Sequence, residues 1–595
     1  MTAGVRRALV FGATGFIGRW LALELLSQQV PVVAAVRSEA SGEQLAAWLR
    51  DHGIASEVEV LLVDFSAEDL GLDLQALDGV TEVHNLAGAF RFGMTAEEAY
   101  QGNVVSARRI VELASRLPGP PRVVHVSGYR VGSHGEPPTA AETEAAYRRL
   151  GAYEASKVEA DVVVQQTARE LGVPFTIVNP STVSGESATG ESDQYLGLAT
   201  TLRDLWRSAL PALPGNADTF IPVVTVDHLA RFMALVPTVP EASGTSYWVL
   251  DDDTPQLPDL LRTVGGRYQV KVPTMSMPVG LIKRLPRRLT GADPETLSFL
   301  DTTRYPVDEA EALAAEHGLS HPETVPALLR WADHLAAYRF GEVSPGGPAR
   351  GFASYAGIHT FMLGEPTAGT VVLPALPVNA DTWADVIAMS DLQVRALDLP
   401  GLGMSSGGEG DWLSWLDAVV GEGVDHLVGH SVGAGLALEF AAAHPDRVGR
   451  LTLVAPAFLQ SRSGLLQRCR PLATAFLRTA SAPKLARTLL GDVGSSDQLA
   501  TSAADLRRRG VARRVARLLS RGASSSRRSH LRKSLRDYPG QVHLVVGEHD
   551  PLAPDAQEGA GRVDITTIPG AGHYPQLTHP AQLIGALEAA VRTSS

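Results

Sequence analysis

The stretch Phe11-Gly-Ala-Thr-Gly-Phe-Ile-Gly18 decides how the first half of the chain is expected to fold. It follows the apolar run ALVF, which predicts a strand, and it opens a segment typical of a helix. Its three glycines allow a tight turn and let backbone N–H groups approach a pyrophosphate at the positive end of the helix. A tight turn without a ligand is the alternative, but the strand–glycine–helix context favours a dinucleotide site. The expected contacts are Gly12, Thr14, Gly15, Phe16, Ile17 and Gly18.

The end of the second expected strand bears on the choice of cofactor. PVVAAV at residues 31–36 is followed by Arg37, where NAD-preferring sites usually carry Asp or Glu. A carboxylate there would bind the ribose 2′-OH, whereas an arginine pairs with a 2′-phosphate. We therefore expect NADP(H) rather than NAD(H), with an ordinary solvated arginine as the alternative. Asp64, after the strand-like VEVLLV, is placed to hydrogen-bond the adenine ring.

Tyr153-Glu-Ala-Ser-Lys157 puts a phenol and an ammonium group on one face of a helix. A nearby cation lowers the cost of ionising a tyrosine, so Tyr153 is expected to exchange a proton near neutral pH. Upstream, the strand-like VVHVS delivers Ser127 at its carboxyl end, where its hydroxyl could orient a substrate carbonyl. A Tyr-x-x-x-Lys pair alone is common on helix surfaces. Behind a glycine motif and a strand-end serine, it predicts carbonyl reduction.

Over essentially residues 7–340, these features resemble the extended short-chain dehydrogenases/reductases. The resemblance rests on GATGFIG, HNLAG at 84–88, Asn103, VSGYRVG, YEASK and IPVVTVDHLARF at 221–232. It implies catalysis by Ser127, Tyr153 and Lys157, and cofactor contacts from the glycine motif, Arg37, Asp64, Ala87 and Lys157. VRSEASGEQLAAWL is most similar to the thioester-reductase-like branch, whose members reduce acyl thioesters or related carbonyls. Asn179-Pro180 stands where extended members often have Arg-Pro.

A second chemical motif, Gly429-His-Ser-Val-Gly433, follows the apolar strand DHLV and precedes an apolar helix. This strand–turn–helix context predicts a nucleophile elbow with Ser431 at its tip. Asp550 and His573 follow, each near a later strand, in the order Ser…Asp…His. We expect His573 to act as the base on Ser431 and Asp550 to hold the imidazole in the correct tautomer.

Residues 352–595 resemble the α/β-hydrolase superfamily on these motifs. A serine at the elbow favours esterase, thioesterase, lactonase or C–C bond hydrolase activity over chemistry that uses an aspartate nucleophile. Relatives usually have His-Gly in the oxyanion loop, where this chain reads Leu373-Pro-Ala-Leu-Pro377. The backbone N–H groups of Leu376 and Val432 are the candidate oxyanion donors.

The expected fold class is α/β in both halves: an N-terminal Rossmann parallel sheet with a small substrate-binding part, and a C-terminal α/β-hydrolase with a helical cap. The expected boundaries are a reductase domain at 1–341, a Pro/Gly-rich linker at 342–351, and a hydrolase domain at 352–595 with its cap at about 457–540. Residues 461–540 hold 18 basic and 4 acidic residues. They predict either a solvated cap surface or an electropositive rim for an anionic substrate such as coenzyme A or an acidic carrier protein.

Composition excludes several other classes of protein. One cysteine, Cys469, argues against a disulfide framework and a cysteine-rich metal site, and we expect no metal. A net charge of −13 argues against general nucleic-acid binding. We expect no membrane span, because no apolar run reaches about 18 residues. With no apparent signal peptide or preceding carrier domain, the expected location is cytoplasmic and any thioester must come from elsewhere.

The sequence thus predicts a bifunctional enzyme for a small acyl or carbonyl substrate, free or bound to coenzyme A or a carrier protein. The first domain would reduce a carbonyl or acyl thioester, and the second would hydrolyse an ester, thioester or lactone. The alternatives for the first domain are a hydroxysteroid-type dehydrogenase, an epimerase or a dehydratase, since the same Tyr/Lys pair serves all of them. A non-enzymatic NADP(H)-sensing scaffold and a hydrolase with a degenerate reductase also remain open.

Overall fold

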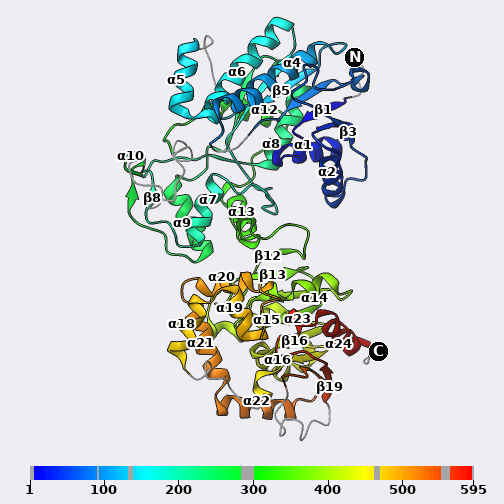
Figure 1. Ribbon diagram of the computed structural model, residues 1–595, viewed down its shortest axis with the longest axis vertical. Helices are drawn as coiled ribbons and strands as arrows, with labels where there is room; N and C mark the ends of the chain where they lie inside the picture. The colour runs from blue at the N-terminus through cyan, green and yellow to red at the C-terminus, as the bar shows by residue number, and fades with distance from the viewer. Residues whose placement is uncertain are drawn as a thin grey trace. The chain divides into compact units, whose positions relative to one another are not determined.

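The computed structural model describes residues 6–89, 93–131, 139–282, 300–460, 469–550 and 563–592. The chain divides into two compact units, Met1–Ala336 and Ala337–Ser595, both drawn in Figure 1. The second unit thus begins five residues before the expected linker and fifteen residues before the expected start of the hydrolase domain at 352. Arg350, expected in the linker, opens strand β12 (Arg350–Tyr355). In the described part of the chain, no helix combines the length and apolarity needed to cross a membrane.

The first unit is built on a seven-stranded parallel sheet in the order β10-β6-β5-β4-β1-β2-β3. The strands are β1 (Ala8–Phe11), β2 (Val32–Val36), β3 (Glu59–Leu62), β4 (Glu82–Asn85), β5 (Arg122–Val126), β6 (Phe175–Pro180) and β10 (Ser246–Val249). Runs such as ALVF are continuously apolar because the sheet is covered on both faces. The strand order reverses between β1 and β4, and this reversal creates a crevice at their carboxyl ends. The expected parallel α/β class is confirmed.

Helices cover both faces of this sheet. On one face, α1 (Phe16–Ser27), α2 (Glu39–Asp51) and α8 (Val226–Leu235) share an apolar core with the strands. On the other face lie α4 (Ser106–Ser115) and α6 (Ala152–Leu171). Helix α6 ends at Gly172, whose left-handed conformation (φ 66°) suits glycine. Its N-terminal turns carry Tyr153 and Lys157, and the Lys157 ammonium group reaches the carboxyl end of β5.

The second unit is built on an eight-stranded sheet in the order β12-β13-β15-β14-β16-β17-β18-β19. Its remaining strands are β13 (Ile358–Gly364), β14 (Thr370–Leu373), β15 (Val394–Leu397), β16 (His426–His430), β17 (Leu451–Val454), β18 (Val542–Gly547) and β19 (Val563–Ile568). Strand β13 is antiparallel to both of its neighbours, β12 and β15, and the strands from β15 to β19 are parallel. Helix α16 (Val432–Ala443) follows β16 directly.

The described residues between β17 and β18 are mainly helical, in the segment where the cap was expected. The helices, yellow to orange in Figure 1, are α18 (Arg470–Thr479), α19 (Ala482–Leu490), α20 (Ala500–Arg507), α21 (Val511–Gly522) and α22 (Ser525–Asp537). Helix α21 buries Val511, Val515 and Leu518 in the core that the strands share. Most of its arginines therefore face away from that core, as its amphipathic sequence predicts.

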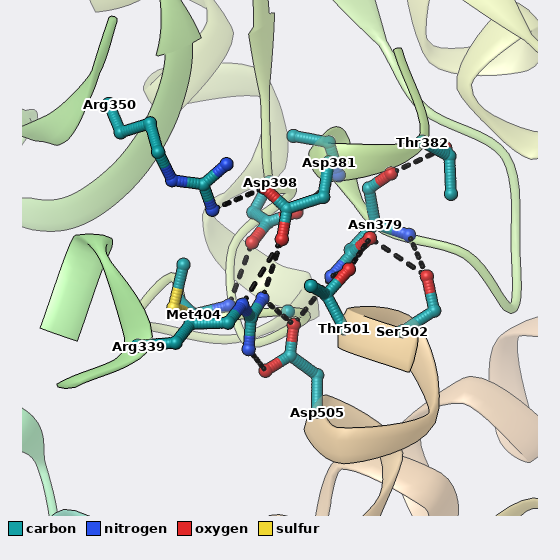
Figure 2. A network of polar contacts seen from close by, with 12 residues as sticks. Arg339, Arg350, Asn379, Asp381, Thr382, Asp398, Met404, Thr501, Ser502 and Asp505 are labelled. Carbon is teal, nitrogen blue, oxygen red and sulfur yellow. Dashed lines mark hydrogen bonds and ion pairs between the residues drawn. The ribbon is translucent and has the colours of Figure 1, made fainter. Parts of the chain in front are cut away.

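A buried ion cluster, which we call the junction cluster, lies at the start of the second unit (Figure 2). Arg339 donates to both carboxylate oxygens of Asp505 on α20, each at 3.0 Å, and to Asp381 at 2.8 Å. Arg350 donates to Asp381 at 2.6 Å, and Asn379 donates to Asp505 at 2.7 Å. Burial alone would lower the pKa of Arg339, but the two aspartates raise it above its ordinary value. The segment entering the second unit is therefore part of the hydrolase core.

Candidate active sites

The glycine motif forms a close turn at the crevice between β1 and β4. Gly12 has a φ of +79°, and a Cβ atom there would lie 2.8 Å from the backbone carbon of Leu86, just after β4. A Cβ on Gly18 would lie 2.1 Å from the carbonyl oxygen of Gly12. Thr14 and Gly15 are exposed at the N-terminus of α1, and Phe16 and Ile17 are half-buried in its first turn. This bare, exposed cradle fits a pyrophosphate.

The other expected cofactor residues follow neighbouring strands of the same sheet. Arg37 is exposed directly after β2, as a partner for a 2′-phosphate must be. Asp64 lies after β3, where its carboxylate accepts hydrogen bonds from the Ser66 hydroxyl (2.6 Å) and N–H (2.8 Å). These bonds lower the pKa of Asp64. The N–H of Ala87 donates to the Asn85 side chain at 3.2 Å, which orders the chain beside the glycine turn.

Two of the three expected reductase residues, Ser127 and Lys157, lie at the carboxyl end of β5. Lys157 Nζ donates to the carbonyl oxygen of Val126 at 2.8 Å, and Ser127 is the next residue along the chain. Ser127 is buried, with 6% of its surface exposed. Tyr153 lies one turn before Lys157 on α6. The structure therefore brings the serine and the lysine to one strand end.

The proton affinity of Tyr153 differs from the sequence expectation. Burial raises the pKa of Tyr153 to about 12, and the charge of Glu154 adds to the effect. Burial also lowers the pKa of Lys157 to about 8. The expectation that Tyr153 exchanges a proton near neutral pH is wrong here, because burial raises the pKa of the phenol and the Lys157 ammonium donates to the carbonyl oxygen of Val126. Tyr153 is protonated at neutral pH, which is the form that donates a proton.

Two further polar residues lie on or against α6, and neither of them was assigned a role from the sequence. Asn103, in the π-helical turn η2 (Tyr100–Val105), donates to the Ser156 hydroxyl at 2.8 Å and accepts from the Ala89 N–H at 2.8 Å. Asp161 lies one turn beyond Lys157 and is buried, which raises its pKa. The i, i+4 spacing from Lys157 was a usable signal for Asp161. The partner of Asn103 was not readable, because Ser156 is 53 residues away in sequence.

The hydrolase nucleophile lies on a strained turn between β16 and α16. Ser431 has a φ of +57°, which non-glycine residues rarely adopt. A Cβ on Gly429 would lie 2.5 Å from Ala434, and one on Gly433 would lie 2.4 Å from the carbonyl oxygen of Leu373. The two glycines of the motif are therefore sterically required.

A continuous hydrogen-bond chain joins the three expected triad residues. His573 Nε2 lies 2.8 Å from Ser431 Oγ, and His573 Nδ1 lies 2.6 Å from Asp550 Oδ2. His430, which precedes the nucleophile, bonds through Nε2 to the carbonyl oxygen of His573 at 2.8 Å. Burial lowers the pKa of His430 to about 3, so its ring is neutral and donates this bond. His430, which sequence reasoning did not single out, thus anchors the loop that carries the catalytic histidine.

Two cavities reach Ser431. One of about 300 Å³ is lined by triad residues and by both expected oxyanion residues, Leu376 and Val432. Tyr574 donates to the carbonyl oxygen of Leu376 at 2.9 Å, which fixes the loop after β14. The other cavity, of about 650 Å³, we call the charged cavity. It is lined by Arg521, Arg527, His530, Glu409 and Glu439 among others.

Comparison with known proteins assigns a family to each half. A family model described as Male sterility protein (NAD-binding) matches residues 10–233, and one described as Alpha/beta hydrolase family matches residues 370–586. The first half is similar to a dTDP-6-deoxy-L-talose 4-dehydrogenase (NAD(P)(+)) from Kitasatospora kifunensis, at 29% identity over 34% of this chain and 60% of that protein's length. The chain therefore spans only part of that relative.

The second half is similar to a pimeloyl-[acyl-carrier protein] methyl ester esterase from Nitrosomonas europaea, at 27% identity over 37% of this chain and 94% of that protein. Among solved structures, the terminal R domain from the myxalamid PKS-NRPS biosynthetic pathway matches with 20% identity and a TM-score of 0.47, over 58% of this chain and 93% of that one. The chain carries an NAD(P)-binding domain of the extended short-chain dehydrogenase/reductase type, fused to an α/β-hydrolase domain.

Proposed function

We propose that this chain is a bifunctional enzyme of acyl or polyketide-like metabolism. Its first domain would reduce a carbonyl or an acyl thioester with NADPH, and its second would hydrolyse an ester, thioester or lactone. The observation that carries the hydrolase activity is the hydrogen-bond chain Ser431–His573–Asp550. The reductase activity is supported by the position of Lys157 and Ser127 at one strand end of a sheet that also carries the glycine cradle.

In the reductase, bound NADPH supplies the hydride, and the glycine turn with Arg37 would hold it. Ser127 donates a hydrogen bond to the substrate carbonyl and thereby orients it. Tyr153, protonated at neutral pH, gives its proton to the oxygen as negative charge develops there. The charge of Lys157 then stabilises the phenolate that remains.

In the hydrolase, His573 takes the proton of Ser431 as Oγ attacks the substrate carbonyl. The N–H groups of Leu376 and Val432 stabilise the tetrahedral oxyanion. His573 then returns the proton to the leaving group, and water releases the acyl group from Ser431 by the same steps. Asp550 stabilises the imidazolium formed at each stage.

The arginines in and beside the charged cavity are the feature that would suit an anionic substrate. Glu409 bonds to both Arg517 and Arg521, and Glu439 bonds to Arg527. Arg521 and Arg527 line this cavity together with the two carboxylates, and Arg517, which does not line it, adds a third guanidinium group through its bond to Glu409. These arginines suit the phosphates of coenzyme A or of a carrier-protein arm. The similarity to an esterase named for a carrier-bound ester supports the same class.

The decisive experiment is a substrate panel for each half of the chain. NADPH consumption is measured with acyl thioesters, aldehydes and ketones, and hydrolysis with matched esters, thioesters and lactones, with products identified by mass spectrometry. Labelled NADPH separates the reductase from an epimerase, because an epimerase returns the hydride and shows no net consumption. Absence of turnover in both panels would favour an NADP(H)-sensing scaffold instead.

Tyr153→Phe should lower NADPH-dependent turnover by about 10²–10⁴-fold, since it removes the proton donor. NADPH binding, measured by fluorescence, should be unchanged because the glycine turn is intact. Tyr147→Phe is the matched control: that phenol is bonded to Glu159 at 2.9 Å, and its loss should leave the rate unaltered. A Tyr153→Phe protein with more than about a tenth of the wild-type rate would exclude the assigned role.

Arg37→Asp should reverse cofactor preference from NADPH towards NADH. The change removes the partner of the 2′-phosphate and supplies an acceptor for the ribose hydroxyl. The measurement is the ratio of kcat/KM for the two cofactors. Arg50→Asp makes the same charge change on an exposed arginine in the last turn of α2, and it should leave the ratio alone. An unchanged ratio in Arg37→Asp would make this residue an ordinary surface arginine.

A further inference from the structure

The carboxylate of Asp550 accepts an N–H group from a second side chain besides His573. Gln460, six residues after β17, directs Nε2 to both oxygens of Asp550, at 2.7 and 2.8 Å. The same nitrogen lies 2.6 Å from His573 Nδ1. Gln460 also lines the cavity of about 300 Å³ beside the triad.

The proton arrangement explains why an amide is suited to this place. Because His573 Nε2 accepts the hydroxyl proton of Ser431, Nδ1 carries the ring proton and donates it to Asp550 Oδ2. Gln460 Nε2 also directs its N–H to this carboxylate, so both nitrogens belong to one cluster centred on Asp550. A carboxylate accepts about four hydrogen bonds, so it accommodates both.

The exposure of Asp550 makes such a restraint necessary. In the folded protein, 17% of the Asp550 side-chain surface is exposed to solvent. Water therefore competes for the carboxylate, and without a restraint the carboxylate would be free to rotate away from the imidazole. The bifurcated, charge-assisted contact from Gln460 Nε2 opposes this rotation, because it reaches both oxygens at once. We propose that Gln460 is a positioning residue that holds Asp550 in the orientation needed by His573. The inference rests on the proposed hydrolase function.

Two substitutions in the full chain separate hydrogen-bond donation from simple space filling. Gln460→Met keeps the volume and removes the donor, so kcat for a p-nitrophenyl ester should fall about 10- to 100-fold with little change in KM. Gln460→Glu places a carboxylate against Asp550, and two like charges so close favour sharing one proton. Its activity relative to wild type should therefore be lowest at alkaline pH and should rise as the pH falls, as a donor is restored.

The matched control is Gln498→Met. Gln498 also donates to a carboxylate, that of Asp385, at 2.5 Å, but neither residue lines the two cavities at Ser431. This variant should keep the wild-type kcat and pH profile. A Gln460→Met protein with wild-type kcat, or a Gln460→Glu protein whose relative activity does not vary with pH, would overturn the proposal.

A second readout needs no knowledge of the substrate. In labelling by a fluorophosphonate, Ser431 Oγ bonds to phosphorus, fluoride leaves, and His573 takes the hydroxyl proton. The labelling rate should fall in Gln460→Met by the same factor as kcat. A wild-type protein that labels but hydrolyses no ester would refute the proposed function, while its labelling rates still decide the role of Gln460. A wild-type protein that neither labels nor hydrolyses would refute both.

Discussion

Replacing Ser431 with alanine should lower ester hydrolysis by about 10⁶-fold, the loss seen when a triad serine is removed. The nucleophile is the atom that forms the covalent intermediate, so no neighbouring group replaces it. NADPH oxidation should continue at the wild-type rate, because the reductase residues belong to the other compact unit with its own apolar cores. Both activities are measured on the same preparation of full-length protein.

Ser414→Ala serves as the control for this prediction. That serine is exposed on α15 (Trp412–Val420) and bonds to the backbone of Asp411, so neither activity should change. Tyr153→Phe should give the reciprocal result, with hydrolysis retained and reduction lost. If either point mutant depressed both activities, the two sites would form one functional unit rather than two separable ones.

Arg339→Met should destabilise the hydrolase unit by about 3–5 kcal/mol, the usual cost of removing one partner from a buried ion pair. Asp505 loses both of its arginine bonds, and its remaining bond from Asn379 does not compensate a buried charge. Denaturant unfolding of the full chain should show an earlier transition for this unit. A hydrolase fragment starting at residue 352 lacks both arginines of the junction cluster and should fail to fold, whereas one starting at residue 337 should fold.

Arg447→Met provides the matched comparison within the same unit. Arg447 pairs with Asp417 at 2.6 Å, and that carboxylate is half exposed. The loss should cost no more than about 1 kcal/mol, as for other surface pairs. Equal stability of fragments starting at 337 and 352 would show that the junction cluster is dispensable.

The parallel sheets and the nucleophile turn could be predicted because their signals are local in sequence. Gly12 and Gly18 must be glycines for the turn to close, and Gly429 and Gly433 must be glycines for Ser431 to reach its strained conformation. Each requirement is visible as a motif within eight residues. The order of Ser431, Asp550 and His573 could likewise be read from strand-like runs that precede or flank them.

The domain boundary, the pKa of Tyr153 and the role of Gln460 could not be predicted, because they depend on contacts between distant parts of the chain. Composition placed Arg350 in a linker because proline and glycine surround it, and nothing nearby shows that Asp381 is its partner. The pKa of Tyr153 follows from burial beneath residues that a helical spacing does not reveal. Gln460 belongs to the triad only because the chain after β17 passes beside Asp550, 90 residues later.

The junction cluster also restricts how this fusion can be rearranged by recombination. A crossover anywhere between residues 339 and 350 would supply Arg339 and Arg350 from different parents, and one at 352 would supply both from the reductase side. Unless the incoming parent carried matching arginines, Asp381 and Asp505 would be buried without their counter-charges. A viable exchange of reductase domains must therefore break the chain before Arg339, so these arginines are inherited with the hydrolase they neutralise.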